Sequence, residues 1–217
     1  MNIRKIFLSW RQGPGSRRYI IGKISRSHAN GVVFIYYPSE VEEAKKDGFQ
    51  PYPEFTDINK KYYDGVLDIF SRRLTQVERS DSSKVLSFWE ANSLKYDTFD
   101  KLALTQGWLP TDNFEFLGDF YPKHLFKFVT DLAQVNSLKM PRGTVSVGDK
   151  LNYEFEKSNK YDSKAIRVYK NDLFIGYIKK KHCNYFHHLG KNKKSDIVVK
   201  AVDQNGVIKQ IFVIVSS

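Results

Sequence analysis

The dipeptide Tyr161-Asp162 combines two side chains that together suit the end of a nucleic-acid strand. The ring of Tyr161 can stack on a base, a contact worth about 1–3 kcal/mol in single-strand-binding proteins. The carboxylate of Asp162 repels phosphate but accepts a hydrogen bond from a free hydroxyl group. The pair therefore favours a chain end over an internal phosphodiester. The alternative is that residues 159–162 form only an Asx-type turn before a core strand, with Ala165, Ile166 and Val168 packing inward.

Positive charge is concentrated in the same part of the chain. The formal net charge is +11, of which residues 1–122 carry +1 and residues 123–217 carry +10. This asymmetry predicts a polyanion as the partner of the C-terminal part. Three lysines at the end of a predicted strand, Lys179, Lys180 and Lys181, would contact backbone phosphate and steepen the salt dependence of binding. Because most of these cations are lysine rather than arginine, base-specific reading is not favoured, and a lysine-rich solubilising surface is the alternative.

The composition excludes several classes of protein. With 217 residues, 41% of them hydrophobic and 15% aromatic, the chain can form packed cores of one or two domains. The single cysteine, Cys183, excludes an internal disulfide framework and favours a reducing, cytoplasmic location. The sequence contains no run of 18 apolar residues, so we expect no membrane-spanning helix.

Hydrophobic patterning predicts an α+β fold with two parts, residues 1–120 and 121–217. In the first part we expect a small antiparallel sheet followed by helices. Its three predicted strands are residues 3–10, 19–24 and 32–37. Its predicted helices are residues 39–47 with Ser39 as N-cap, 64–74, 80–92 and one that Asp97 or Thr98 caps and that ends before Gly107. Residues 108–116 are predicted to form a turn.

After Pro122 the pattern changes to an alternation with period two, which is typical of half-buried strands. The predicted strands are residues 125–129, 151–155, 165–169, 173–178, 197–202 and 207–215, and residues 182–189 are a short helix. Many short strands with one helix indicate a small β-barrel or rolled sheet.

The C-terminal part contains Val147-Gly148-Asp149-Lys150-Leu151, then Glu156-Lys157-Ser158-Asn159-Lys160-Tyr161-Asp162-Ser163-Lys164-Ala165-Ile166-Arg167-Val168, then Ile175-Gly176-Tyr177-Ile178-Lys179-Lys180. Over residues 123–217 this pattern resembles the HIRAN domain, which occurs alone in bacteria and fused to helicase-type remodelers in eukaryotes. The resemblance implies an OB-like β-barrel that binds DNA and recognises a single-stranded 3′ end. Lys157 and Lys160 stand where the family often has proline, a residue that stiffens the loop.

The resemblance also implies a role for individual residues. Tyr161 would stack on a terminal base and Asp162 would accept a hydrogen bond from the 3′-hydroxyl. Lys180 would hold a backbone phosphate, and Tyr177 stands beside the same site where other members can carry histidine. With Asn159 and Lys179, these residues form the predicted DNA-binding set, and no catalytic residue, metal or cofactor is expected.

Residues 1–60 are more loosely similar to the small N-terminal subdomain of HipA-like toxin kinases. The similarity depends on Gly22-Lys23-Ile24 followed by residues 31–37. No kinase motif follows, so this part is expected to contact another protein. The second hypothesis for the whole chain is accordingly a regulatory or antitoxin-like partner of a HipA-type kinase.

A metal-dependent nuclease is the third and least favoured hypothesis. Asp149 with Asp162-Ser163-Lys164 mimics the acid and lysine spacing of such an enzyme, but the Asp–Lys pair lies in a predicted loop. Cys183 and His187 have the i, i+4 spacing of zinc ligands on a helix. Because no second cluster supplies the remaining ligands, a structural or surface role is expected for both.

Overall fold

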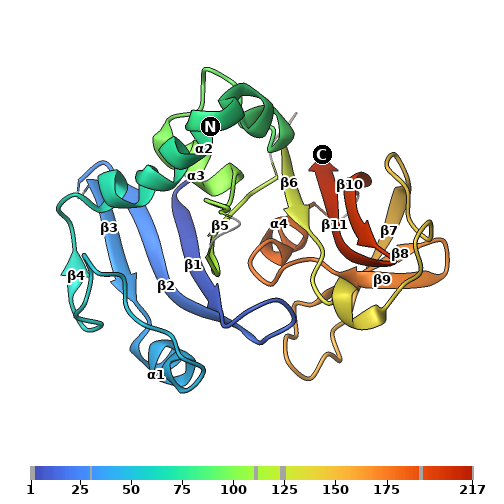
Figure 1. Cartoon of the computed structure of the whole chain (residues 1–217), viewed down its shortest axis with the longest axis horizontal. Helices are drawn as coiled ribbons and strands as arrows, with labels where there is room; N and C mark the ends of the chain where they lie inside the picture. The colour runs from blue at the N-terminus through green and yellow to red at the C-terminus, as the bar shows by residue number, and fades with distance from the viewer. Residues whose placement is uncertain (1–2, 30, 110–111, 123–125, 191–192, 217) are drawn as a thin grey trace. The chain divides into compact units, whose positions relative to one another are not determined.

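The computed structural model describes residues 3–29, 31–109, 112–122, 126–190 and 193–216, with only the backbone of residues 75–82. The chain folds as two compact units, Met1–Asp119 and Phe120–Ser217 (Figure 1). Both units mix helices with antiparallel strands, which confirms the predicted α+β class.

The N-terminal unit contains a five-stranded antiparallel sheet in the order β4-β3-β2-β1-β5. Its strands are β1 (Lys5–Arg11), β2 (Arg18–Ser27), β3 (Gly31–Tyr36), β4 (Lys61–Tyr62) and β5 (Phe114–Gly118). The predicted meander of three strands is confirmed in β1, β2 and β3. The predicted turn over residues 108–116 is wrong at its end, because β5 pairs with β1. That pairing buries Phe116 completely, and long-range packing outweighs the local turn signal.

Three helices complete this unit: α1 (Pro38–Lys46), α2 (Val66–Phe88) and α3 (Thr98–Leu104). The N-cap of helix α1 is Tyr37, two residues before the predicted Ser39, and Pro38 lies in its first turn. The two helices predicted over residues 64–92 are one continuous helix, α2. Of the two residues predicted to cap α3, Asp97 is the N-cap, since its side chain accepts a hydrogen bond from the Asp100 backbone N–H.

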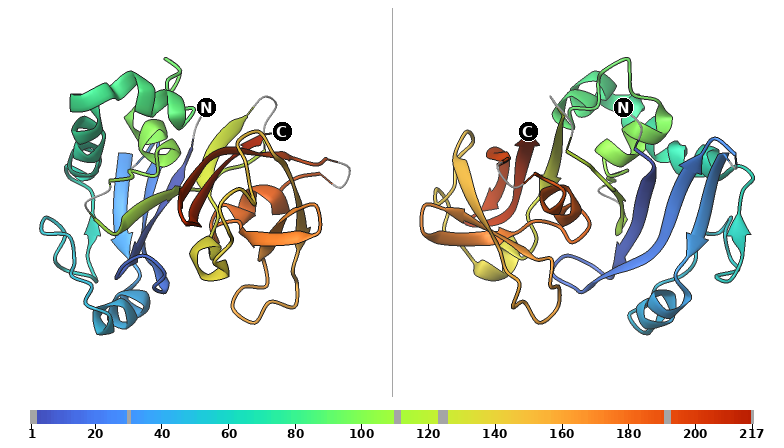
Figure 2. Two further views of the ribbon diagram at one scale, coloured as in Figure 1. Left: turned by 45° about the vertical axis from the view of Figure 1, so that its right-hand side comes forward. Right: turned by 180° about the vertical axis from the view of Figure 1, so that it is seen from behind.

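The C-terminal unit is a curled six-stranded antiparallel sheet of OB-like form (Figures 1 and 2). The strands are β6 (Lys127–Asp131), β7 (Lys150–Phe155), β8 (Ile166–Lys170), β9 (Leu173–Tyr177), β10 (Asp196–Asn205) and β11 (Val207–Ser216), in the order β6-β11-β10-β7-β8-β9. A 3₁₀ turn, η1 (Val135–Leu138), and a short helix, α4 (Cys183–His187), complete the unit. The start of the strand predicted over residues 125–129 lies outside the described residues.

An isolated bridge between Ala133 and Tyr177 joins the two edges of this sheet. Residue 133 follows β6 and Tyr177 ends β9, so the bridge is a seam that closes the curled sheet into a barrel. Helix α4 contributes Tyr185, which is fully buried and lies 5.1 Å from the ring of Phe128. Among the described helices of the whole chain, none is both long and apolar enough to cross a membrane.

Candidate nucleic-acid interface

The loop between β7 and β8 is closed at its base by backbone hydrogen bonds. The Glu156 N–H donates to the Ala165 carbonyl at 2.9 Å, and the Ala165 N–H donates to the Asp162 carbonyl at 2.9 Å. The Asn159 N–H also donates to the Glu156 carbonyl at 3.2 Å. These bonds define a compact loop whose neck continues the ladder of the two strands.

Asn159 organises the tip of this loop. Its Oδ1 accepts hydrogen bonds from the backbone N–H groups of Tyr161, at 2.9 Å, and Asp162, at 3.0 Å, which is the predicted Asx turn. Its Nδ2 donates to Glu156 Oε2 at 2.7 Å. All the hydrogen-bonding atoms of the Asn159 side chain therefore hold the loop, and Asn159 positions its neighbours.

The ring of Tyr161 projects from this turn into solvent, with 91% of its surface exposed. The neighbouring Asp162 is half-buried, and its Oδ1 accepts a hydrogen bond from the Lys164 N–H at 2.9 Å. The core strand predicted after the turn is also present, since Ala165, Ile166 and Val168 are all buried. The turn and the core strand fit both interpretations of this segment, a DNA-end site and a purely structural turn. The two interpretations therefore differ only in whether Tyr161, whose ring stabilises no core in the unit, contacts DNA.

Asp162 and Lys180 share a neighbour in the buried thiol of Cys183. Burial, and after it the negative charge of Asp162, raises the pKa of Cys183 to about 12, while Lys180 lowers it. The structure thus brings the predicted acceptor of the hydroxyl and the predicted phosphate cation to the same end of α4. Lys180 is exposed, as a phosphate contact requires.

Tyr177 lies at the barrel seam. Its backbone N–H and carbonyl pair with the carbonyl and N–H of Ala133, at 3.0 and 2.7 Å. The preceding residue is Gly176, with φ +143°, and a Cβ there would lie 2.7 Å from the Ala133 carbonyl oxygen. Glycine is therefore required for this close approach. The hydroxyl of Tyr177 donates to Glu156 Oε2 at 3.0 Å, which joins the seam to the Tyr161 loop.

Glu156 is a residue of this site that the sequence reasoning did not single out. It accepts hydrogen bonds from both Asn159 and Tyr177, and these bonds, the one from Asn159 first, lower the pKa of its carboxyl. Its place at the start of the recognised motif was the available signal.

Lys179 is a correction to the predicted DNA-binding set. Its side chain is only 3% exposed, and its ammonium group forms an ion pair with Asp131 at the end of β6. Asp131 also accepts a hydrogen bond from Gln210 Nε2 at 3.0 Å. Adjacent residues leaving a strand point to opposite sides, so Lys180 faces solvent while Lys179 faces inward. Lys179 closes the barrel and is not available to phosphate.

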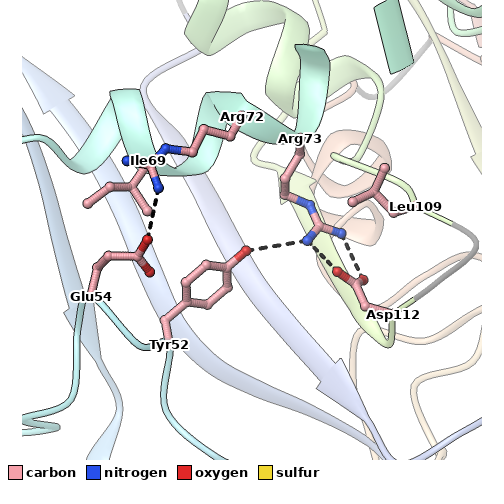
Figure 3. Close-up of a pocket in the computed structure, with 7 residues that line it drawn as sticks. All are labelled: Tyr52, Glu54, Ile69, Arg72, Arg73, Leu109 and Asp112. Carbon is pink, nitrogen blue, oxygen red and sulfur yellow. Dashed lines mark hydrogen bonds and ion pairs between the residues drawn. The ribbon is translucent and has the colours of Figure 1, made fainter. Parts of the chain in front are cut away.

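The N-terminal unit has a pocket of about 310 Å³ that helix α2 lines together with the loops before β4 and β5 (Figure 3). Arg73 lies in its wall and donates to both carboxylate oxygens of Asp112, at 2.5 and 2.8 Å, and to the Tyr52 hydroxyl at 3.3 Å. At its rim Arg72 pairs with Glu54 at 3.0 Å. The charged groups of the pocket therefore satisfy one another, which indicates a structural network.

The residues that the sequence suggested as metal ligands or nuclease residues make other contacts in the structure. Asp149 forms an ion pair with Lys170 at 2.7 Å, and Cys183 is buried, with its Sγ 3.5 Å from the Ile178 carbonyl oxygen. His187 is exposed, and its Nε2 lies 3.0 Å from the Lys164 carbonyl oxygen. Within the described residues, no group of three or more histidine, cysteine, aspartate or glutamate side chains could hold a metal ion.

Comparison with known families agrees with this architecture. Residues 126–214 match the HIRAN domain, so the predicted resemblance of the C-terminal unit is confirmed. A HIRAN domain supports a DNA-binding role for this unit. The crystal structure of the HIRAN domain of human HLTF is similar with a TM-score of 0.34 and 20% identity, over 42% of this chain and 77% of that chain.

No curated protein matches the chain. The similarity of the N-terminal unit to HipA-like kinases, its role in contacting a protein partner and the cytoplasmic location all stay predictions.

Proposed function

We propose that the C-terminal unit binds single-stranded DNA or DNA with a free 3′ end, and that the protein acts by binding rather than by catalysis. The observation that carries the proposal is the 91% exposed ring of Tyr161 on a loop fixed by hydrogen bonds. Because the backbone of the loop is already fixed, stacking of the ring on a base orders little more than the Tyr161 side chain itself. The HIRAN match and the net charge of +10 in residues 123–217 support DNA as the partner.

Each residue has a distinct role in this proposal. Tyr161 stacks on the terminal base, and the carboxylate of Asp162 accepts a hydrogen bond from the 3′-hydroxyl. Lys180 contacts a backbone phosphate. Asn159 holds the loop, and Tyr177 borders the same site through Glu156.

Recognition of the end is tested with two fluorescent single strands that differ only in a 3′-hydroxyl or a 3′-phosphate. Fluorescence anisotropy should give weaker binding for the 3′-phosphate, because its charge would lie beside Asp162. Equal affinity for the two strands would refute the role of Asp162.

Stacking is tested with Tyr161→Ala, which should weaken binding by about 5- to 150-fold, the equivalent of 1–3 kcal/mol. Tyr63→Ala is the matched control, because it removes another exposed tyrosine, 53% accessible, from the N-terminal unit. If the two variants bind alike, the loop is not the DNA site.

A further inference from the structure

A second surface borders the Tyr161 loop, on the face of β8 and β9. It consists of Arg167, Tyr169, Phe174 and Tyr177, which we call the β8–β9 face. In the register of the two strands, Arg167 lies opposite Tyr177 and Tyr169 lies opposite Phe174. A shift of register between Val168 and Tyr169 resets the alternation, so Phe174 and Tyr177 share a face although they are three residues apart.

The side chains of this face are in mutual contact and half-buried. The Tyr169 and Phe174 rings have centroids 5.9 Å apart, and those of Phe174 and Tyr177 are 5.1 Å apart. The guanidinium carbon of Arg167 lies over both Phe174, at 4.7 Å from the ring centroid, and Tyr169, at 5.3 Å. The planar guanidinium of Arg167 thus makes cation–π contacts with the aromatic rings of this face.

The ion pair that the Arg167 guanidinium forms is a long one. The Arg167 side chain is 36% exposed, and its Nη1 is 4.0 Å from Glu156 Oε1, the outer limit of such a contact. The guanidinium is planar and partly exposed, and guanidinium planes stack on nucleic-acid bases in RNA recognition. Arg167 therefore offers a flat surface where a lysine would offer only a charge.

The β8–β9 face is continuous with the Tyr161 loop. The Tyr177 hydroxyl and Asn159 Nδ2 both donate to Glu156 Oε2, and Asn159 Oδ1 accepts from the Tyr161 N–H. A strand whose last base lies on Tyr161 can therefore continue across Tyr177 toward Arg167.

The charges of this face select a base rather than a phosphate. Glu154 lies opposite Arg167 on β7, and Glu156 lies beside it. Two carboxylates around one guanidinium disfavour an anion but do not oppose a neutral base. Backbone phosphates are then left to exposed lysines such as Lys180.

We propose that the guanidinium of Arg167, supported by Phe174 and Tyr169, stacks on a base of the strand that lies 5′ to the terminal nucleotide. This second stacking site rests on the proposed DNA-binding function. It extends the contact from the strand end to an upstream base.

The test uses six-nucleotide thymidine strands with a 3′-hydroxyl, intact or lacking the base at one position in turn. Dissociation constants are measured for the full chain and for Arg167→Lys, which keeps the charge but removes the plane. We expect Arg167→Lys to bind the intact strand about 5- to 150-fold more weakly. Loss of the base at one upstream position should weaken DNA binding by the unsubstituted protein but should not change DNA binding by Arg167→Lys.

Two further variants make the result specific. Arg142→Lys is the matched control, because it makes the same change at an exposed arginine of the same unit, and it should bind as the unsubstituted protein does. Phe174→Ala should show the same insensitivity to the upstream abasic position, because it removes the support of the guanidinium. Circular dichroism confirms that each variant folds.

The outcomes separate this inference from the proposed function. The dissociation constant of each abasic strand is compared with that of the intact strand. If removal of each base weakens binding by the same factor for Arg167→Lys as for the unsubstituted protein, the proposal of a second stacking site is wrong. The end site would still stand if loss of the 3′-terminal base had no effect on Tyr161→Ala. If the unsubstituted protein binds none of the strands, both proposals fail.

Discussion

Replacement of Lys179 by methionine should destabilise the barrel rather than weaken a DNA contact. The change keeps the apolar stem of the side chain and removes the ammonium group that pairs with Asp131. Asp131 is itself 10% exposed in its side chain and would be left with the hydrogen bond from Gln210. Removing one partner of a buried pair costs about 3–5 kcal/mol, because the remaining charge has lost its compensation.

That cost is large for a unit of this size. Domains are stable by about 5–15 kcal/mol, and for a domain of 60–100 residues each kcal/mol shifts Tm by about 4–8 °C. Lys179→Met should therefore lower the Tm of the C-terminal unit by at least about 12 °C. The three tryptophans, Trp10, Trp89 and Trp108, all lie in the N-terminal unit. Tryptophan fluorescence thus reports that unit as an internal control, and far-UV circular dichroism reports both.

Two further variants test whether Lys179 stabilises the barrel while Lys180 contacts DNA. Lys180→Met should leave Tm unchanged, weaken DNA binding and reduce the slope of log affinity against log salt by about 0.7, the value for one phosphate contact on a single strand. Lys179→Met with Asp131→Leu should recover much of the lost stability, because it removes both charges together. The reasoning is refuted if Lys179→Met keeps its Tm but loses affinity for DNA, since Lys179 would then be a phosphate contact.

Three further predictions follow from individual contacts. Asn159→Ala removes both the acceptor for the Tyr161 and Asp162 N–H groups and the donor to Glu156, so anisotropy should show weaker DNA binding than for the unsubstituted protein, unless the Asx turn plays no part in binding. Asp112→Ala leaves the 5% exposed Arg73 without its bidentate partner and should lower the free energy of unfolding of the N-terminal unit by up to about 3 kcal/mol in urea, followed by tryptophan fluorescence; an unchanged midpoint would contradict this. Because burial raises the pKa of Cys183 to about 12, the thiol is protonated at pH 8 and should react with a thiol reagent only in denaturant; fast reaction of the folded protein would show that the thiol is accessible.

The parts that could be predicted from the sequence are those set by local patterns. Strand β7 was found from the alternation of apolar and polar residues, and the turn at Asn159 follows from its own side chain. β5 was missed because its pairing partner, β1, lies about a hundred residues earlier. A local turn signal does not reveal such a partner.

The candidate site divides in the same way. Tyr161, Asp162 and Asn159 depend on one short loop, and the sequence sufficed to find them. Lys179 was assigned to DNA because nothing near it in the sequence shows that Asp131 faces it across the barrel seam. The place of Arg167 over Phe174 depends on a shift of register, which the period-two pattern does not contain.

The loop that carries Tyr161 also shows how its shape is held without the two prolines that the family often has. Proline acts chiefly by restricting the unfolded chain, at any pH. Here Lys157 and Lys160 occupy those positions, and hydrogen bonds from Asn159 and Tyr177 to the Glu156 carboxylate hold the folded loop instead. These bonds lower the pKa of Glu156, so their stabilisation is complete above about pH 4.3, the ordinary pKa of glutamate, and is lost as pH falls through the lower folded value.

The loop should therefore loosen on acidification, with weaker DNA binding as the consequence. The comparison is with Glu156→Gln, which cannot lose a charge and should bind more weakly than the unsubstituted protein at pH 7. The ratio of the two affinities should shrink as pH falls from 7 toward 4, since protonation makes the glutamate resemble glutamine. A ratio that stays constant over this range would show that the Glu156 carboxylate does not hold Tyr161 in place, and that the backbone hydrogen bonds of the loop suffice.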